Sequence, residues 1–435
     1  MPIITDSLER SSANKWLPWI VCITGSLLFF YEAIQMMMFN SLNTSLMASF
    51  NVNATQLGFV SSVYFYTSAS LIFVAGNMLD RFSTRMLILM SMLTCTIGTL
   101  GFALSPDLII AAAFRLIVGI GGAFCFLSCV KLASRWFPPS RRAMVVGVIV
   151  TMFMLGGWVA QTPLTALIHK FGWRYALFLD GLLGIVITAL MWFVIKDRPK
   201  KDSHLTAEER ETLKKIGLKK AIVSVLKNPN NWCGAFYTCL TNLPVYLVGA
   251  FLGSMYLQQA QHLSTSHAAF VSGMIFFGSF LGSTSIGWIS DRIKKRRLPM
   301  IVGALLILAV VAIIIYVPGL SFIELMLLFF ALGYVTSAQV LGYPTVAEHN
   351  PAVLTGTAVS IVSTITVFSG AVIFPLAGWL LDVSGQHKKI KGVMHYSLTA
   401  YHHAMIILLV AAIGALIAAL LIKETNCKHQ MDATL

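Results

Sequence analysis

Two charged residues, Glu32 and Arg115, lie inside stretches that are otherwise apolar. A charge in the hydrocarbon core of a membrane costs a few kcal/mol unless it faces protein or water, so each is expected to have a partner. Glu32 lies eight residues before Asn40, and Arg115 lies eight residues after Asp107. At about 1.5 Å per helical residue, both are predicted about 12 Å below the same membrane surface. The sequence therefore predicts that Glu32 and Arg115 pair.

Such a pair has the chemistry of proton coupling. A carboxylate whose proton affinity changes when water or substrate reaches it can take up a proton on one side of a membrane and release it on the other. Arg115 would be its partner or would bind a substrate carboxylate. Two structural alternatives remain open: a static ion pair that packs two helices, and an Arg115 bonded to backbone carbonyls. Asp180 and Glu324, nearer the ends of their helices, are secondary candidates.

Two basic turns share a pattern. Residues 76–85 read GNMLDRFSTR and residues 287–292 read GWISDR. Glycine allows helices to approach closely, aspartate at a helix end accepts hydrogen bonds, and the cations hold the turn at the cytoplasmic surface. One copy alone is compatible with an ordinary charged helix end, but two copies favour a conformational latch. The predicted latch residues are Gly76, Asp80, Arg81, Arg85, Gly287, Asp291 and Arg292.

The elements that carry these residues are membrane helices. Of 435 residues, 57% are hydrophobic and 11% are charged, which excludes a soluble domain. A span needs about 20 apolar residues, and the chain has twelve such stretches. They are predicted at 17–40, 54–79, 86–105, 108–134, 143–168, 174–195, 231–257, 267–290, 298–317, 320–346, 352–381 and 399–422. The predicted fold is an all-α membrane protein.

The basic residues predict the orientation. With the N-terminus in the cytoplasm, cytoplasmic segments hold 25 of the 31 Lys and Arg residues, the opposite side holds 5, and Arg115 is the remaining one. This bias fits the positive-inside rule, so both termini and the central loop are predicted to be cytoplasmic. The net charge of +14 is then explained by topology, and no nucleic-acid partner is predicted.

The two halves of the chain resemble each other. Gly76 and Asp80 match Gly287 and Asp291 at an offset of 211 residues, while prolines 139 and 163 match prolines 351 and 375 at an offset of 212. Such internal repeats are common in transporters. The predicted domains are an N-terminal bundle at 1–195, a cytoplasmic linker at 196–230 and a C-terminal bundle at 231–435, with six helices in each bundle.

These features resemble the major facilitator superfamily. Its G-x-x-x-D-R-x-G-R-[RK] motif is matched by Gly76, Asp80, Arg81 and Arg85, although Ser83 replaces the usual glycine. Residues 115–122, RLIVGIGG, resemble its R-x-x-x-G-x-G motif. The resemblance implies two pseudo-symmetric six-helix bundles, alternating access, and a central cavity lined by the first, fourth, seventh and tenth helices.

Polar and aromatic residues of those helices are candidates for substrate contact. Prolines 244 and 344 are expected to break two of the helices locally. Besides Arg115, the candidates are Tyr31, Gln35, Tyr237, Asn242, Tyr246, Tyr334, Gln339 and Tyr343. Any one of them could instead serve in packing.

The predicted function is import of a small polar or zwitterionic solute, such as an amino acid, a nucleoside or an organic acid, together with protons. The region around Gln161, Thr162 and Pro163, with residues 348–358, resembles phagosomal nutrient transporters of intracellular bacteria and departs from the drug antiporter pattern. A multidrug or metabolite efflux antiporter and a non-transporting membrane sensor are the alternatives. We expect a monomer in the bacterial inner membrane.

No enzymatic activity, cofactor or metal is predicted. A phosphate-binding loop of the GxxxxGK[ST] type is missing from the sequence, which argues against ATP as the energy source. The seven cysteines and the four histidines of residues 387–403 fit no metal-ligand spacing.

Overall fold

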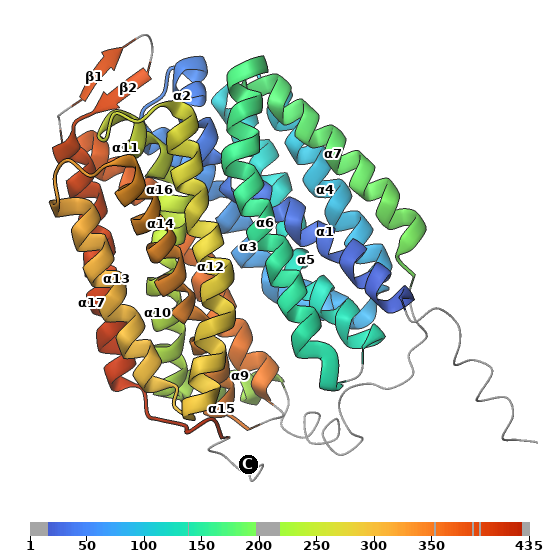
Figure 1. Ribbon diagram of the computed structural model, residues 1–435. Coiled ribbons are helices and arrows are strands. Elements are labelled where there is room, and N and C mark those ends of the chain that lie inside the picture. Colours follow the sequence, from blue (N-terminus) through green and yellow to red (C-terminus); the bar gives the residue numbers. More distant parts are fainter. Residues whose placement is uncertain are drawn as a thin grey trace, which may run out of the picture.

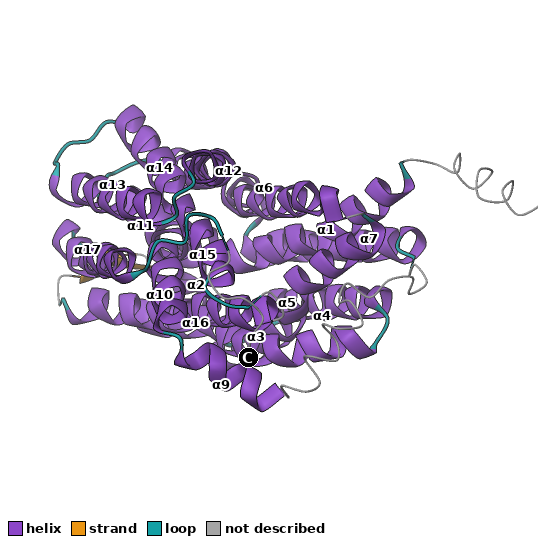
Figure 2. Ribbon diagram, turned by 90° about the horizontal axis from the view of Figure 1, so that it is seen from below, coloured by secondary structure: helices purple, strands orange, loops and turns teal. Residues whose placement is uncertain are grey.

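The computed structural model describes residues 16–137, 139–196, 218–351, 354–384, 387–390 and 393–428. Within α3 and at the start of α6 and α9, a few side chains lie outside the description, including those of Asp80 and Arg81. The described chain is almost entirely helical. Its long helices run side by side in two groups, the first half of the chain in one and the second half in the other (Figures 1 and 2).

The first group contains six long helices and one short one. The long helices are α1 (Leu17–Met37), α3 (Ala54–Arg81), α4 (Thr84–Leu104), α5 (Leu108–Trp136), α6 (Pro139–Phe171) and α7 (Trp173–Val194). The short helix α2 (Phe39–Phe50) follows α1 directly and ends where Asn51 adopts a left-handed conformation.

The second group repeats this arrangement, with two helices that change type along their length. Its elements are α10 (Pro229–Pro244), η2 (Val245–Leu252), α11 (Gly253–Gln259), α12 (Thr265–Ile293), α13 (Arg297–Tyr316), α14 (Phe322–Thr336), η3 (Ser337–Leu341), α15 (Gly342–Glu348), α16 (Thr355–Val383) and α17 (Leu398–Leu421). The amphipathic helix α9 (Leu218–Lys227) precedes them.

The membrane spans match the sequence prediction closely. Eleven helical stretches of the described chain are long and apolar enough to cross a membrane. The 28-residue helix α3 has the required length but carries many serine, threonine and tyrosine residues. It runs alongside the others as the twelfth helix, and most of its contacts are with helices α5 and α16 (Figure 1).

Local departures from regular helix occur beside both prolines singled out in the sequence. Pro244 ends α10, and the next turn is π-helical over η2. Before Pro344, residues Ser337–Leu341 form the 3₁₀ helix η3. Proline lacks a backbone N–H and disturbs the ladder of hydrogen bonds, which explains irregular backbone at these positions.

The short helix α2 and the paired strands β1 and β2 are not predicted by the sequence. Helix α2 forms where the sequence predicts the end of the first span and a loop. The antiparallel strands β1 (His387–Ile390) and β2 (Val393–Tyr396), whose register pairs His387 with Tyr396, form where a loop is predicted. Both elements lie at the same end of the molecule (Figure 1), which we call the α2 end; the opposite end is the α15 end. Short polar elements of this kind have no membrane-span signature.

Hydrogen bonds between the two groups of helices gather at the α2 end. Thr55 donates to Asp382 through its backbone nitrogen at 2.9 Å and its hydroxyl at 2.5 Å, and the Ala54 nitrogen donates to the Tyr396 hydroxyl at 3.1 Å. Deeper in the molecule, the Ser254 nitrogen donates to Asn40 at 2.8 Å. The α2 end is therefore closed.

The α15 end differs. Among the residues whose side chains are described, no hydrogen bond or ion pair joins the two groups at this end. The strongest ionic cluster there lies inside the second group: Arg296 binds Glu348 at 2.8 Å and Asp291 at 2.6 Å. Burial alone would lower the pKa of Arg296, but its carboxylate partners outweigh burial and raise the pKa above its ordinary value.

Candidate substrate and proton site

Glu32 is buried where α1 meets α3, α5 and η2. Only 6% of its surface is exposed. One carboxylate oxygen, Oε1, accepts a hydrogen bond from the Tyr64 hydroxyl of α3. The other, Oε2, has no hydrogen-bond partner among the described residues. A buried carboxylate with a single neutral donor and no paired cation is costly to keep charged, and binding a proton removes that charge.

Two glycines of the motif in α5 allow Tyr64 to reach this position. A Cβ atom on Gly122 would lie 2.5 Å from the Tyr64 hydroxyl, and a Cβ on Gly119 would lie 2.6 Å from the Tyr64 carbonyl oxygen. Any side chain at either position would push α3 or the tyrosine ring away. The R-x-x-x-G-x-G-G pattern therefore permits close packing of α3 against α5, and that packing brings Tyr64 to Glu32.

Arg115 is fully buried but does not pair with Glu32, contrary to the sequence prediction. Its Nη1 donates to the Gln35 carbonyl at 2.9 Å. The guanidinium lies 4.8 Å from the ring centre of Phe39 and 5.1 Å from that of Tyr64. Nε and Nη2 have no hydrogen-bond partner among the described residues. The Tyr64 side chain contacts both charged groups, which explains why they do not bind each other directly.

A second carboxylate, that of Asp180, is linked to Arg115 through Gln35, which binds both residues. The Gln35 amide nitrogen donates to Asp180 of α7 at 2.6 Å, and Thr99 donates to the Gln35 amide oxygen at 2.8 Å. In the sequence Asp180 is only a secondary candidate, because it lies near a helix end. Asp180 is buried beside Gln35 and therefore belongs to the same group of buried polar residues as Glu32 and Arg115. Arg115 forms no described ion pair with either acid.

The second half of the chain contributes an aromatic residue, Tyr246, to the region around Tyr64 and Glu32. Tyr246 of η2 packs against Phe65 of α3 with ring centres 5.1 Å apart. Tyr246 and Asn242 are both buried, and η2 contacts α1 as well as α16. Tyr343 packs against the α16 side chains of a small apolar cluster. Tyr246 therefore lies where the two halves of the protein are in contact, and Phe65 connects it to Tyr64, the donor to Glu32.

Other predicted contact residues lie elsewhere. The buried Tyr31 donates to the Asp180 carbonyl at 3.3 Å, inside the first group of helices. Tyr237 donates to the Met300 carbonyl of α13 at 3.0 Å. The Tyr334 hydroxyl accepts a hydrogen bond from Ser285 at 2.8 Å. In this conformation the three hydroxyl groups form hydrogen bonds within one half, and Tyr31, Tyr237 and Tyr334 are not part of the proposed substrate site.

Gln339 has an intermediate position. It lies half-buried in η3, and its carbonyl accepts a hydrogen bond from Thr238 at 3.1 Å. The 3₁₀ turn brings this residue next to α10, but no described hydrogen bond of its side chain points to the interface between the halves. Its role as a substrate contact stays a prediction.

A polar cluster near the α2 end is not predicted as a set. Asn40 donates to Gln161 at 2.7 Å, and Gln161 donates to the Gly249 carbonyl of η2 at 2.9 Å. Asn43 donates to the Phe251 carbonyl. The π-helical turn leaves carbonyls available for these amides. Two features of the sequence could have indicated this cluster. Three amide side chains lie near the ends of apolar stretches, and the Gln-Thr-Pro segment of α6 departs from the drug antiporter pattern.

Comparison with known families decides the class of the protein. The model of the Major Facilitator Superfamily matches residues 25–375 and 245–430. The chain belongs to the Major Facilitator Superfamily. Its major facilitator fold, with two bundles of transmembrane helices, is thus confirmed. The family and the fold are those of transporters rather than of enzymes.

Similar major facilitator proteins differ in what their names describe. The probable sulfoacetate transporter SauU of Cupriavidus necator is 24% identical over 62% of this chain and 65% of its own length. The 4-hydroxybenzoate transporter PcaK of Acinetobacter baylyi is 25% identical over 70% of this chain and 71% of its own length. The membrane sensor protein UhpC of Salmonella typhimurium is 25% identical over 87% of this chain and 88% of its own length.

A solved major facilitator structure has the same fold. A bacterial homolog of the human lysosomal transporter Spinster, in an inward-facing and unoccupied conformation, aligns with a TM-score of 0.75. Sequence identity is 17%, and the alignment covers 93% of this chain and 97% of that one. At this identity the likeness concerns the fold alone.

The two turns with the family motif lie at matching helix ends, after α3 and after α12. Arg85 donates to the Trp192 carbonyl of α7 at 2.7 Å. Arg292 stacks on Trp288, with 5.1 Å between the guanidinium carbon and the ring centre. The side chains of Asp80 and Arg81 lie outside the description. Both of these contacts lie within one half of the protein.

The expected close helix approach at the two motif glycines is not observed. A Cβ on Gly76 would be 3.7 Å from Leu127, which is an ordinary contact, and a Cβ on Gly287 would meet nothing within 4 Å. Neither glycine is therefore under steric constraint in this conformation.

Proposed function

We propose that this protein is a proton-coupled secondary transporter of small organic anions. The observation that carries this proposal is the environment of Glu32: buried, at the contact of the two bundles, with one oxygen bonded to Tyr64 and the other without a partner among the described residues. A carboxyl group in that position can change its protonation when the bundles rock and expose it to either side.

Coupling follows from the neighbours of Glu32. In the closed arrangement at the α2 end, protonated Glu32 needs no cation, so Arg115 remains available as a positive charge. When Glu32 loses its proton, its negative charge favours Arg115 as a partner, with Tyr64 moving aside. We propose that this exchange of partners links proton movement to substrate binding and release.

The substrate class rests on Arg115 and on the relatives. Its Nε and Nη2 groups lack partners among the described residues, and a guanidinium with free donors is suited to a carboxylate or sulfonate. The names of SauU and PcaK state sulfoacetate and 4-hydroxybenzoate as the molecules that those proteins transport. We propose that substrate contacts also come from Asn242, Tyr246 and Tyr343 of the second half, with Gln35 holding Arg115.

The direction of transport and the orientation are part of the proposal. The basic residues around the α15 end favour its placement in the cytoplasm, with both termini there and the α2 end outside the bacterial inner membrane. We propose that residues 1–195 and 231–435 move as two units of a monomer during import. The turns at Asp80 and Asp291 would then latch the α15 end when it closes.

The test is uptake into proteoliposomes with an imposed pH gradient. A panel of sulfoacetate, 4-hydroxybenzoate and a hexuronate serves as substrates. We expect Glu32→Gln to abolish accumulation driven by the gradient while exchange of labelled for unlabelled substrate continues. Glu324→Gln is the matched control, since Glu324 is an exposed acid in α14. Unchanged accumulation in Glu32→Gln would remove Glu32 as the proton site.

A second candidate function is sensing without transport. It is favoured by the UhpC match, which extends over more of this chain than the SauU match does. The uptake assay separates the two functions. A sensor would bind an anion, detected as increased thermal stability, and would show neither accumulation nor exchange.

A further inference from the structure

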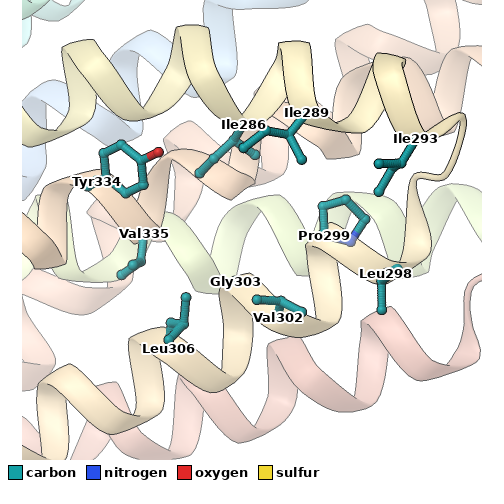
Figure 3. A pocket seen from close by; sticks show the side chains of 10 residues that line it. All are labelled: Ile286, Ile289, Ile293, Leu298, Pro299, Val302, Gly303, Leu306, Tyr334 and Val335. Carbon is teal, nitrogen blue, oxygen red and sulfur yellow. The ribbon is translucent and has the colours of Figure 1, made fainter.

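An apolar groove of about 270 Å³ runs along the outside of the second bundle. It lies between α12 and α13 and is closed at its base by α14 (Figure 3). Ile286, Ile289 and Ile293 form one wall, and Leu298, Val302 and Leu306 form the other. From Leu298 to Leu306 the wall extends for roughly 12 Å, at about 1.5 Å per residue.

The groove faces the lipid. Ile289 is 40% exposed, Val302 45% and Leu306 47%, although the helices that carry them are long enough to span the membrane. Exposed aliphatic side chains on such helices contact acyl chains. A groove of this shape holds one chain in a fixed position, unlike the flat surface of a helix.

One end of the groove opens at a strongly basic turn. Ile293 and Leu298 line that end (Figure 3). In the sequence, the turn between them contains Lys294, Lys295, Arg296 and Arg297. Arg292, Lys294 and Lys295 are exposed. Asp291 is the sole acid of residues 286–306, and it binds Arg296.

An exposed tryptophan marks the depth of this turn in the membrane. Trp288 lies in the last turns of α12, and Arg292 stacks on its ring. Tryptophan prefers the level of the lipid headgroups. The basic mouth of the groove therefore lies at headgroup depth, with the apolar walls below it.

We propose that this groove is a binding site for an anionic phospholipid. One acyl chain lies between α12 and α13, and the headgroup phosphate is held by Arg292, Lys294 and Lys295. The excess of cations at the mouth selects an anionic headgroup over a zwitterionic one. The bound lipid joins the turn of the second family motif to the membrane, outside the path of the transported solute.

The test compares phosphatidylglycerol with phosphatidylcholine of the same chain length. Purified protein is titrated with each lipid, and bound molecules are counted by native mass spectrometry. Val302→Trp fills the groove, and Leu305→Trp, on an exposed part of the same helix outside the groove, is its control. The triple variant Arg292→Gln, Lys294→Gln, Lys295→Gln removes the charge; its control neutralises Lys170, Lys388 and Lys389.

We expect phosphatidylglycerol to be preferred at least about tenfold, and both test variants to lose that preference while both controls keep it. Inorganic phosphate at millimolar concentration should not displace the lipid. Equal binding of the two lipids would overturn the proposal, as would full retention by Val302→Trp. Displacement by phosphate would show a site for a free anion and would overturn it as well. A monodisperse elution profile establishes that each variant is folded.

Discussion

At the scale of single residues, Tyr64 determines how the two buried charges relate to each other. Its hydroxyl binds Glu32, and its ring lies beside the Arg115 guanidinium. If Glu32 and Arg115 exchange partners during transport, Tyr64 must move or change its hydrogen bond. The tyrosine is therefore a positioning residue for both charges.

Replacing Tyr64 with phenylalanine removes the hydrogen bond and keeps the ring beside Arg115. A hydrogen bond to a charged group contributes about 1.5–3 kcal/mol, so we expect uptake to slow by about tenfold or more. The pH dependence of uptake should shift as well, because the donor to Glu32 is lost. Tyr175→Phe, at an exposed position of α7, is the control. An unaltered pH profile in Tyr64→Phe would contradict the positioning role.

Gly122 tests the same contact from the side of α5. In Gly122→Ala the new methyl group would lie 2.5 Å from the Tyr64 hydroxyl and would force the ring to move. Overpacking of this kind costs about 1–3 kcal/mol, so thermal stability should fall. Gly147→Ala is the matched control, because its methyl group meets nothing within 4 Å. Equal melting temperatures for the two variants would show that α5 can shift freely.

At the scale of elements, the closed α2 end depends on a cross-bundle cap of α3. The first N–H groups of a helix lack partners within the helix. In α3 the N–H groups of Ala54 and Thr55 bind Tyr396 and Asp382 from the other half of the protein. The Tyr396 hydroxyl also donates to Asp382 at 2.6 Å. Strand β2 and the end of α16 thus stabilise closure.

Asp382→Asn should weaken that closure. The amide loses the charge that strengthens both Thr55 bonds, so the open form at this end should become more populated. Spin labels at Ala48 and Lys388, both exposed, report the separation of the halves in a cysteine-free background. We expect a longer distance component in Asp382→Asn and none in Asp107→Asn, which changes an acid within one half. Identical distance distributions would argue against the cap.

The segment after α17 is attached to the α12–α13 turn by Glu424. Its carboxylate accepts the backbone N–H groups of Arg296 at 2.8 Å and Arg297 at 2.9 Å. Burial tends to raise the pKa of Glu424, but the backbone N–H donors outweigh it and lower the pKa below its usual value of 4.5. The attachment therefore favours the charged carboxylate.

A depressed pKa sets the direction of the pH effect. The contribution of Glu424 is fully present above the pKa of the detached segment, about 4.5, and is lost as the pH falls through the lower pKa of the attached form. A spin label at Lys428 should stay immobile at pH 7 and become mobile only as the pH falls below 4.5, through the lowered pKa of the attached carboxylate. In Glu424→Gln it should be mobile throughout. Equal mobility at pH 7 and 3 in the wild type would contradict this attachment.

At the scale of the whole molecule, the architecture was predictable from the sequence. Apolar stretches of span length have a strong signature, and the repeated Gly-x-x-x-Asp-Arg turn pointed to the superfamily that the family model shows. The helices begin and end within a few residues of the predicted limits, except α6, which extends further at its start. Burial of Glu32 and Arg115 followed from their positions inside apolar stretches.

The partners of these charges were not predictable. Helical depth placed Glu32 and Arg115 at the same level, but depth gives no information about rotation around each helix axis. The intervening Tyr64 comes from a third helix, and its position depends on glycines of α5 that contact it only in three dimensions. For the same reason Tyr237 and Tyr334, which belong to suitable helices, face α13 and α12 instead of the other bundle.

The central claim is that anion movement carries protons through Glu32. It is tested most directly in proteoliposomes that contain a trapped pH indicator, with an inward gradient of a transported anion and no initial pH difference. We expect the anion to acidify the interior in the wild type and to leave the internal pH unchanged in Glu32→Gln, whose exchange activity persists. Anion uptake without acidification in the wild type, or equal acidification in Glu32→Gln, would contradict it.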